Sequence, residues 1–265
     1  MKTLGPVATL LVTIGLSTWV ATACHAQALE TESARFLHRG SYELGSAFEF
    51  QTSGEGIERA VPLAMEYGVT DRFSMLVEPV LYTAIRPKHG AGATGPGDLE
   101  ITAFYLMRPE APRLPALALA LEVKLPTARD QLIGTGQTDW AAYAIASRRA
   151  GRLDAHANLG YNLNGQPPGV KLNNTISGAL ATEYHLSDRG ELFVELLGTT
   201  ASVGEGGGDN PANPNPVAPE VGGSELVGTA GVGWSPVPHS LLSLGVSYDS
   251  NHALLLRPGV TYRLR

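Results

Sequence analysis

Three polar side chains occupy alternate positions of one short segment: Asp154, His156 and Asn158. In an extended strand, residues two apart point to the same face, so these side chains are expected to project together. A histidine beside a carboxylate and an amide has the groups that orient an imidazole toward a nucleophilic serine. No serine is marked as that nucleophile, and Glu183 with His185 gives only a weaker signal of this kind. We interpret the three residues as a polar strand face, with catalysis by His156 as the alternative.

Motifs of the common enzyme classes are absent from the sequence. It contains no GxSxG, HExxH or GxxxxGK[ST] pattern. The glycine-rich stretches 90–97 and 204–208 are not followed by a helical pattern, so they are interpreted as loops rather than phosphate-binding turns. The single cysteine, Cys24, cannot form a disulfide or a CxxC metal site within the chain. The sequence therefore predicts no enzyme, no cofactor and no metal.

Composition narrows the fold class. The 265 residues are 43% hydrophobic and carry a formal net charge of -6, which argues against both a coiled coil and global disorder. The 31 glycines and 18 prolines interrupt the chain too often for a large helical domain and favour a turn-rich all-β fold. No basic cluster is present, so nucleic acid is not an expected partner.

The first residues have the layout of a secretory signal peptide. Lys2 precedes an apolar stretch, 4–20, and small residues follow over 21–26. We expect cleavage after Ala26, which gives a signal peptide over 1–26 and one exported domain over 27–265. A retained membrane anchor and a lipoprotein modified at Cys24 are the alternatives.

Apolar and polar residues alternate with a period of two in many windows of the exported chain. The clearest is 153–164, where one face is apolar and the other is polar or glycine. Strands of this length are long for a soluble sandwich but fit the 9–11 residues that cross a bilayer at a tilt. The twelve strands predicted in this way are 42–51, 57–67, 73–82, 98–107, 116–125, 139–148, 153–164, 176–186, 191–198, 225–234, 242–249 and 253–264.

The connections between these windows alternate in length. Short turns fall at 69–72, 110–114, 150–151, 187–190 and 236–238, whereas the intervening connections are mostly longer and rich in glycine, proline and asparagine. Outer-membrane barrels combine tight periplasmic turns with long extracellular loops, and an even number of strands closes such a barrel. The pattern predicts a 12-stranded antiparallel transmembrane β-barrel, with a soluble β-sandwich as the alternative.

The polar faces of the predicted strands carry more acids than bases. An acidic, wet lumen would favour cations and neutral polar solutes over anions, whereas acids paired with bases would only fill the interior. Pro62, Pro79 and Pro258 fall inside predicted strands and are expected at bulges or strand ends. The residues predicted to line a solute path are Asp98, Glu100, Glu122, Lys124, Asp154, His156, Asn158, Glu191 and Glu195.

Several short motifs occur in a fixed order along the chain. They are EYGVTDRF at 66–73, VEP at 77–79, GPGDL at 95–99, EVKLPT at 122–127 and AHANLGY at 155–161. Together they resemble the MetA-pathway phenol-degradation, or transporter, family of bacterial outer-membrane β-barrels, over about residues 40–265. The resemblance implies a barrel of this size in the outer membrane of a Gram-negative bacterium, associated with the breakdown of aromatic compounds.

The function expected from these observations is a channel or transporter for passive uptake or efflux of small molecules, aromatic compounds included. Two alternatives stay open: an outer-membrane enzyme that uses His156 in the lumen, and a structural or adhesive barrel with a filled lumen. The expected partners are membrane lipid, lipopolysaccharide, the small-molecule solute and the barrel-assembly machinery. A mature segment of about a dozen residues precedes the first strand; it is too short for a plug domain but long enough to fold into the mouth.

Overall fold

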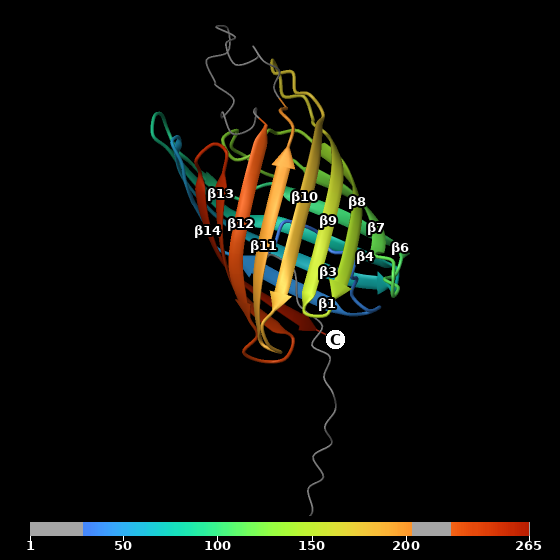
Figure 1. The fold of residues 1–265 in the computed structure, drawn as a ribbon. Helices are drawn as coiled ribbons and strands as arrows, with labels where there is room; N and C mark the ends of the chain where they lie inside the picture. Colours follow the sequence, from blue (N-terminus) through green and yellow to red (C-terminus); the bar gives the residue numbers. More distant parts are fainter. Residues whose placement is uncertain (1–28, 203–223, 265) are drawn as a thin grey trace, which may run out of the picture.

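A computed structural model describes residues 29–202 and 224–264, and these form an all-β structure (Figure 1). The predicted signal peptide and the glycine-rich stretch 204–208 lie outside the described residues. No helix among the residues described is long and apolar enough to cross a membrane. The strands are β1 (Tyr42–Ala47), β2 (Glu49–Thr52), β3 (Gly56–Thr70), β4 (Phe73–Pro87), β5 (Ala93–Gly95), β6 (Leu99–Arg108), β7 (Ala116–Leu125), β8 (Asp139–Ala150), β9 (Leu153–Leu163), β10 (Thr175–His185), β11 (Gly190–Thr199), β12 (Glu225–Trp234), β13 (Ser240–Asp249) and β14 (Leu254–Leu264).

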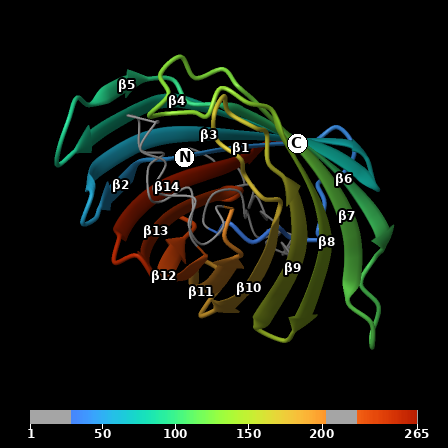
Figure 2. The same ribbon diagram turned by 90° about the horizontal axis from the view of Figure 1, so that it is seen from above.

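The strands close into a single barrel. Each strand pairs antiparallel with its neighbour, and β1 pairs with both β3 and β14, so the sheet closes on itself (Figure 2). β1 and β2 form one barrel strand that is interrupted at Phe48, because both pair with β14 on one side and β3 on the other. β5 pairs only with β4, in the connection before β6. The predicted 12-stranded barrel is therefore confirmed, and the soluble sandwich is wrong.

Three prolines lie where the pairing is irregular, as the sequence predicts. Pro62 lies at a register shift between β3 and β4. Pro79 forms the last pair between β4 and β6. Pro258 lies opposite the break between β1 and β2, where its carbonyl accepts a hydrogen bond from the Phe48 N–H at 2.9 Å. A proline lacks the amide hydrogen that a ladder needs, so interruptions at these positions cost few hydrogen bonds.

The predicted bounds of two strands are too short. β3 and β4 have 15 residues each, whereas alternation predicted 57–67 and 73–82. The end of β4 pairs with the start of β3 as far as Pro87 and Gly56, and this part projects beyond the rest of the barrel (Figure 1). At its other end β3 continues past the predicted bound to Thr70. Away from lipid, a strand no longer needs an apolar outer face, so alternation loses its signal there.

Apolar side chains point outward and polar or small side chains point inward. On β7, Leu117, Leu119 and Leu121 are exposed, and the alanines between them are buried. Tyrosines and tryptophans lie exposed near both ends of the strands, for example Trp234 at one end and Trp140 at the other. This is the surface of a protein surrounded by lipid, with aromatic belts at two interfaces.

The barrel has two distinct ends. One end, here called the turn end, carries the short connections 71–72, 109–115, 151–152, 186–189 and 235–239 and the end of β14. The opposite end, the loop end, carries the longer connections 126–138 and 164–174 (Figure 1). By the rule for outer-membrane barrels, the turn end faces the periplasm.

The register predicts which of two adjacent residues meets lipid. Leu226 is 53% exposed on the outer wall, whereas Val227 lines an internal cavity. A fluorophore attached to Leu226→Cys is expected to be quenched by brominated lipid, and one attached to Val227→Cys is not, because neighbouring strand residues point to opposite faces. Quenching of the Val227→Cys label alone would mean that the strand register is wrong by one residue.

Candidate functional site

Residues 29–41 run through the inside of the barrel (Figure 2) and are here called the inner segment. The Glu195 carboxylate accepts hydrogen bonds from both the N–H and the hydroxyl of Thr31, each at 2.6 Å. The Ala34 N–H donates to Ser147 Oγ at 2.8 Å. The side-chain amide of Asn158 is oriented so that both its nitrogen and its oxygen form hydrogen bonds. The nitrogen donates to the Glu32 carbonyl at 3.0 Å, and the oxygen accepts from the Glu32 N–H at 2.6 Å. Side chains of the wall thus hold the segment's backbone.

Apolar packing closes the half of the lumen nearer the turn end. Ala34 lies in a cluster of buried side chains that includes Phe104 and Ile145, and Phe36 packs edge-on against Phe104 with ring centroids 6.0 Å apart. Leu29 packs against a second cluster, Phe193 with Leu241. The inner segment therefore acts as the filling of this half of the barrel.

Glycines on the wall make room for this filling. A Cβ at Gly231 would lie 2.2 Å from Cζ of Phe193, and a Cβ at Gly68 would lie 2.3 Å from the His38 carbonyl oxygen. Both distances are shorter than any tolerable contact, so these positions admit only glycine.

A cavity of about 660 Å³ remains inside the barrel beside the inner segment. Glu66, Glu78, Glu100 and Glu122 are among its lining residues. A smaller cavity of about 160 Å³ adjoins it and reaches the strand ends near Gln51, towards the loop end. The two cavities share five lining residues, Glu30, Leu197, Glu225, Val227 and Arg257, so together they extend from the loop end into the barrel, where the larger one reaches Glu43 and Arg263.

Basic side chains neutralise only some of the lumenal acids. Arg263 binds Glu43 at 2.6 Å, and Arg257 binds Glu49 at 2.8 Å and also Glu30 of the inner segment. Arg108 donates instead to the Pro115 carbonyl at 3.1 Å. The acids that line the cavity therefore outnumber the three arginines that line it with them, Arg35, Arg257 and Arg263.

The residues predicted to line a path all face the interior, but they lie at three levels. Glu100, Glu122 and Asn158 line the larger cavity. Asp98 and Lys124 lie near the loop end, where Lys124 also binds Asp139, and the Asp98 carboxylate accepts from the Ala128 N–H at 2.9 Å. The other four, Asp154, His156, Glu191 and Glu195, are buried and line neither cavity.

His156 does have a serine within reach. Ser147 Oγ lies 2.8 Å from His156 Nδ1, and His156 Nε2 lies 3.6 Å from the Glu183 carboxylate. These side chains come from neighbouring strands, β8, β9 and β10, and all three are buried. The sequence did not identify Ser147, because the window 139–148 alternates too weakly to assign its inward face.

An ion-pair network lies next to these side chains, near the turn end. Arg35 of the inner segment binds Asp154 at 2.5 Å and Glu110 at 2.9 Å, and Arg149 binds Asp154 at 2.6 Å. Desolvation opposes ionisation of Glu110, but hydrogen bonds from the Arg149 N–H and from Arg35 outweigh it and lower the pKa of this carboxyl. Sequence reasoning missed both arginines, because nothing in a lone basic residue indicates which acid it meets.

The inner segment also carries an acid into the acidic part of the lumen. Burial raises the pKa of Glu32 well above its ordinary value, and the neighbouring carboxylates of Glu78 and Glu66 raise this pKa further. Glu32 therefore holds its proton at neutral pH more readily than a carboxyl in water.

A family model described as "Putative MetA-pathway of phenol degradation" matches residues 40–221. This chain belongs to that family. The resemblance that the sequence motifs suggested is thus confirmed, and with the lipid-facing wall it places the protein in the outer membrane.

Solved structures of low sequence identity share the fold. An outer membrane channel from Pseudomonas putida F1 superposes with a TM-score of 0.66 at 12% identity, covering 89% of this chain and 100% of that one. The NanC porin superposes with a TM-score of 0.57 at 9% identity, covering 83% and 100%. The KdgM porin in complex with disordered oligogalacturonate gives 0.54 at 10% identity, covering 84% and 99%. No curated protein matches the sequence.

The contact between Ser147 and the inner segment is expected to stabilise the barrel. Ser147→Ala would leave the buried Ala34 N–H without an acceptor, which costs about 1–3 kcal/mol. The matched control is Ser74→Ala, because Ser74 Oγ is equally buried but has no hydrogen-bond partner among the described residues. In urea titrations followed by heat-modifiable gel migration, Ser147→Ala should unfold at lower urea than wild type and Ser74→Ala should not. Equal midpoints for the two variants would contradict the assigned contact.

Proposed function

We propose that this outer-membrane barrel is a channel that passes small molecules and prefers cations and neutral polar solutes to anions. The observation that carries the proposal is the pair of adjoining cavities, which lead from the loop end into the barrel and whose charged lining residues are mainly carboxylates. The family description and the fold shared with channels and porins support the general function.

The route has a wide part and a narrow part. Solute enters from the loop end and reaches the cavity around Glu100 and Glu122. Beyond it, the inner segment and the apolar cluster around Phe104 occupy the half nearer the turn end. Passage therefore depends on the inner segment moving within the lumen, and the filled half limits the size of the solute.

The solute proposed is small and carries no negative charge. Carboxylates in a confined lumen create a negative potential that attracts cations and repels anions. Neutral aromatic compounds fit the same lumen, since Tyr143 and Phe104 line the cavity together with the acids. The family's description as a pathway of phenol degradation supports this class of solute.

The charge preference is tested with planar bilayers in a potassium chloride gradient. The reversal potential of the wild-type channel should favour potassium, and more strongly at low salt, because screening reaches only about 10 Å at 0.1 M. Replacing Glu100 and Glu122 together with glutamine should lower the potassium-to-chloride permeability ratio by roughly a factor of two, because the substitutions remove two lumenal carboxyl groups at almost constant volume.

The matched control is Asp188→Asn, which removes an acid from an exposed turn outside the cavities. It should leave the permeability ratio close to that of wild type. An anion-selective wild-type channel, or an equal effect of Asp188→Asn, would show that the cavity acids do not set the preference.

A second candidate function, hydrolysis by Ser147, is favoured by one observation: the contact between Ser147 and His156. The surroundings of Ser147 argue against it, because the side chain is 1% exposed and its oxygen already accepts from the Ala34 N–H. We expect a fluorophosphonate probe to leave Ser147 unlabelled. Labelling of wild type that is lost in both Ser147→Ala and His156→Gln would establish the enzyme instead.

A further inference from the structure

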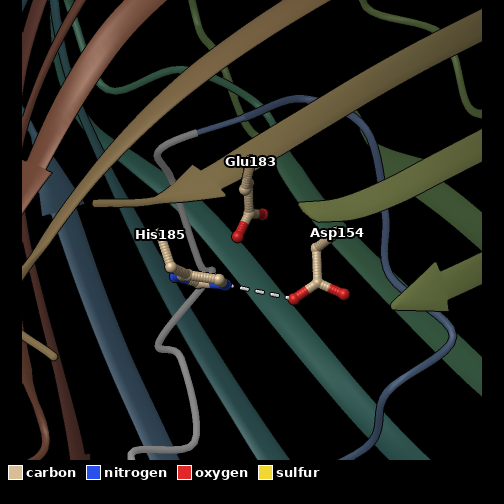
Figure 3. Close-up of side chains that lie close together, drawn as sticks. All are labelled: Asp154, Glu183 and His185. Carbon is tan, nitrogen blue, oxygen red and sulfur yellow. Dashed lines mark hydrogen bonds and ion pairs between the residues drawn. The ribbon is translucent and has the colours of Figure 1, made fainter. Parts of the chain in front are cut away.

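We propose that Asp154, Glu183 and His185 form a binding site for a divalent transition-metal ion such as Zn²⁺. One ligand atom from each of the three lies within 4.8 Å of the other two (Figure 3). Four ligand atoms around zinc, at about 2.0–2.1 Å from the metal, lie ~3.3 Å apart, so small side-chain rotations suffice to close the site. This site is separate from the proposed solute path, and its occupation does not depend on conduction.

The backbone brings the three residues together. Asp154 of β9 and Glu183 of β10 are directly opposite each other in the strand register, and His185 follows two residues later on the same face of β10. Two carboxylates directly opposite each other across a strand pair repel, so this arrangement needs positive charge nearby.

The protonation of His185 is the one that a metal ligand needs. Arg149 Nη2 lies 2.8 Å from His185 Nε2. A guanidinium group only donates hydrogen bonds, so Nε2 must be the unprotonated nitrogen and the proton must be on Nδ1. Nδ1 faces the Glu191 carboxylate at 3.3 Å. Histidines that bind metals commonly donate their second N–H to a carboxylate in this way, which fixes the ring and aims the lone pair.

Arg149 occupies the place of a cation in this site. Its Nη2 lies between Asp154 Oδ2, at 2.6 Å, and His185 Nε2, at 2.8 Å. His185 Nε2 lies 3.2 Å from Asp154 Oδ2. When Nε2 carries no proton, both atoms are hydrogen-bond acceptors, so only a positive charge between or beside them stabilises this contact. The Arg149 side chain is 38% exposed, so it can turn away and leave this place to a metal ion.

The inner segment can stay in place when the metal binds. Arg35 binds the other oxygen of Asp154, Oδ1, at 2.5 Å, while the metal would take Oδ2.

The ligand set indicates the class of metal. One imidazole nitrogen and two carboxylate oxygens suit zinc and related first-row ions, whereas magnesium and calcium prefer oxygen ligands alone. We therefore expect zinc chloride to bind and magnesium chloride not to compete with it.

The test is calorimetric titration of zinc chloride into the untagged, folded barrel in detergent. Wild type should bind one zinc ion, and His185→Gln should lose at least about tenfold in affinity. Arg149→Gln should bind zinc more tightly than wild type, because it removes the competing cation without touching a ligand. A purely structural ion-pair network predicts no such gain.

The matched control is His252→Gln, which removes an exposed histidine that contacts Tyr248 at the opposite end of the barrel. It should bind zinc as wild type does. Heat-modifiable migration confirms that each variant is folded, and His185→Gln decides the question if Arg149→Gln fails to fold. The proposal is overturned if wild type binds no zinc, or if His185→Gln and wild type bind it equally.

Discussion

The absence of water in the bilayer core is the constraint on which this structure depends. Each backbone amide in a membrane-spanning segment must find its partner within the protein, and the pairing of β1 with β14 supplies the last set by closing the ring. Closure fixes which face every residue takes. Leucines such as Leu159 then meet lipid, and the polar residues between them are enclosed in the lumen.

A closed ring of this size creates a second problem, because its interior must be filled either by protein atoms or by water. The inner segment fills the half nearer the turn end. Gly40 and Ser41 at its end form backbone hydrogen bonds with Gly68 of β3, but residues 31–34 have no strand beside them with which to pair. Side chains take the place of that strand: Glu195 binds Thr31, Ser147 binds Ala34, and Asn158 binds both backbone groups of Glu32. Buried backbone groups are thereby satisfied without a sheet. The half nearer the loop end stays hollow, and there the acids remain beside a cavity.

The sequence predicted the barrel because two of its signals are local. Alternation shows the side that meets lipid, and connection length shows the two ends, so neither requires knowledge of contacts between distant residues. The strand bounds were wrong at β3 and β4, because the alternation stops before the strand does, towards Thr70 in β3 and towards Pro87 in β4. Ser147 was missed for a related reason, since the inward face of 139–148 is not distinguished from the outward face by hydrophobicity.

The polar face of β9 shows that alternation predicts the direction of a side chain but not the residues that it contacts. Asp154, His156 and Asn158 point inward together, as predicted, yet each does something different. Asp154 binds two arginines, His156 contacts Ser147, and Asn158 holds the inner segment. These partners come from β8 and from the inner segment, so the chemistry of each residue depends on tertiary contacts. A shared strand face was therefore not evidence for a shared site.

The central claim is that this barrel conducts and that the inner segment sets the width of its path. Single-channel recording of wild type beside a deletion of residues 29–38 tests it most directly, with heat-modifiable migration confirming that both barrels are closed. The account predicts a small conductance for wild type and a several-fold larger one for the deletion, because the deletion removes the filling from the half nearer the turn end. Equal conductances, or none from either closed barrel, would contradict it.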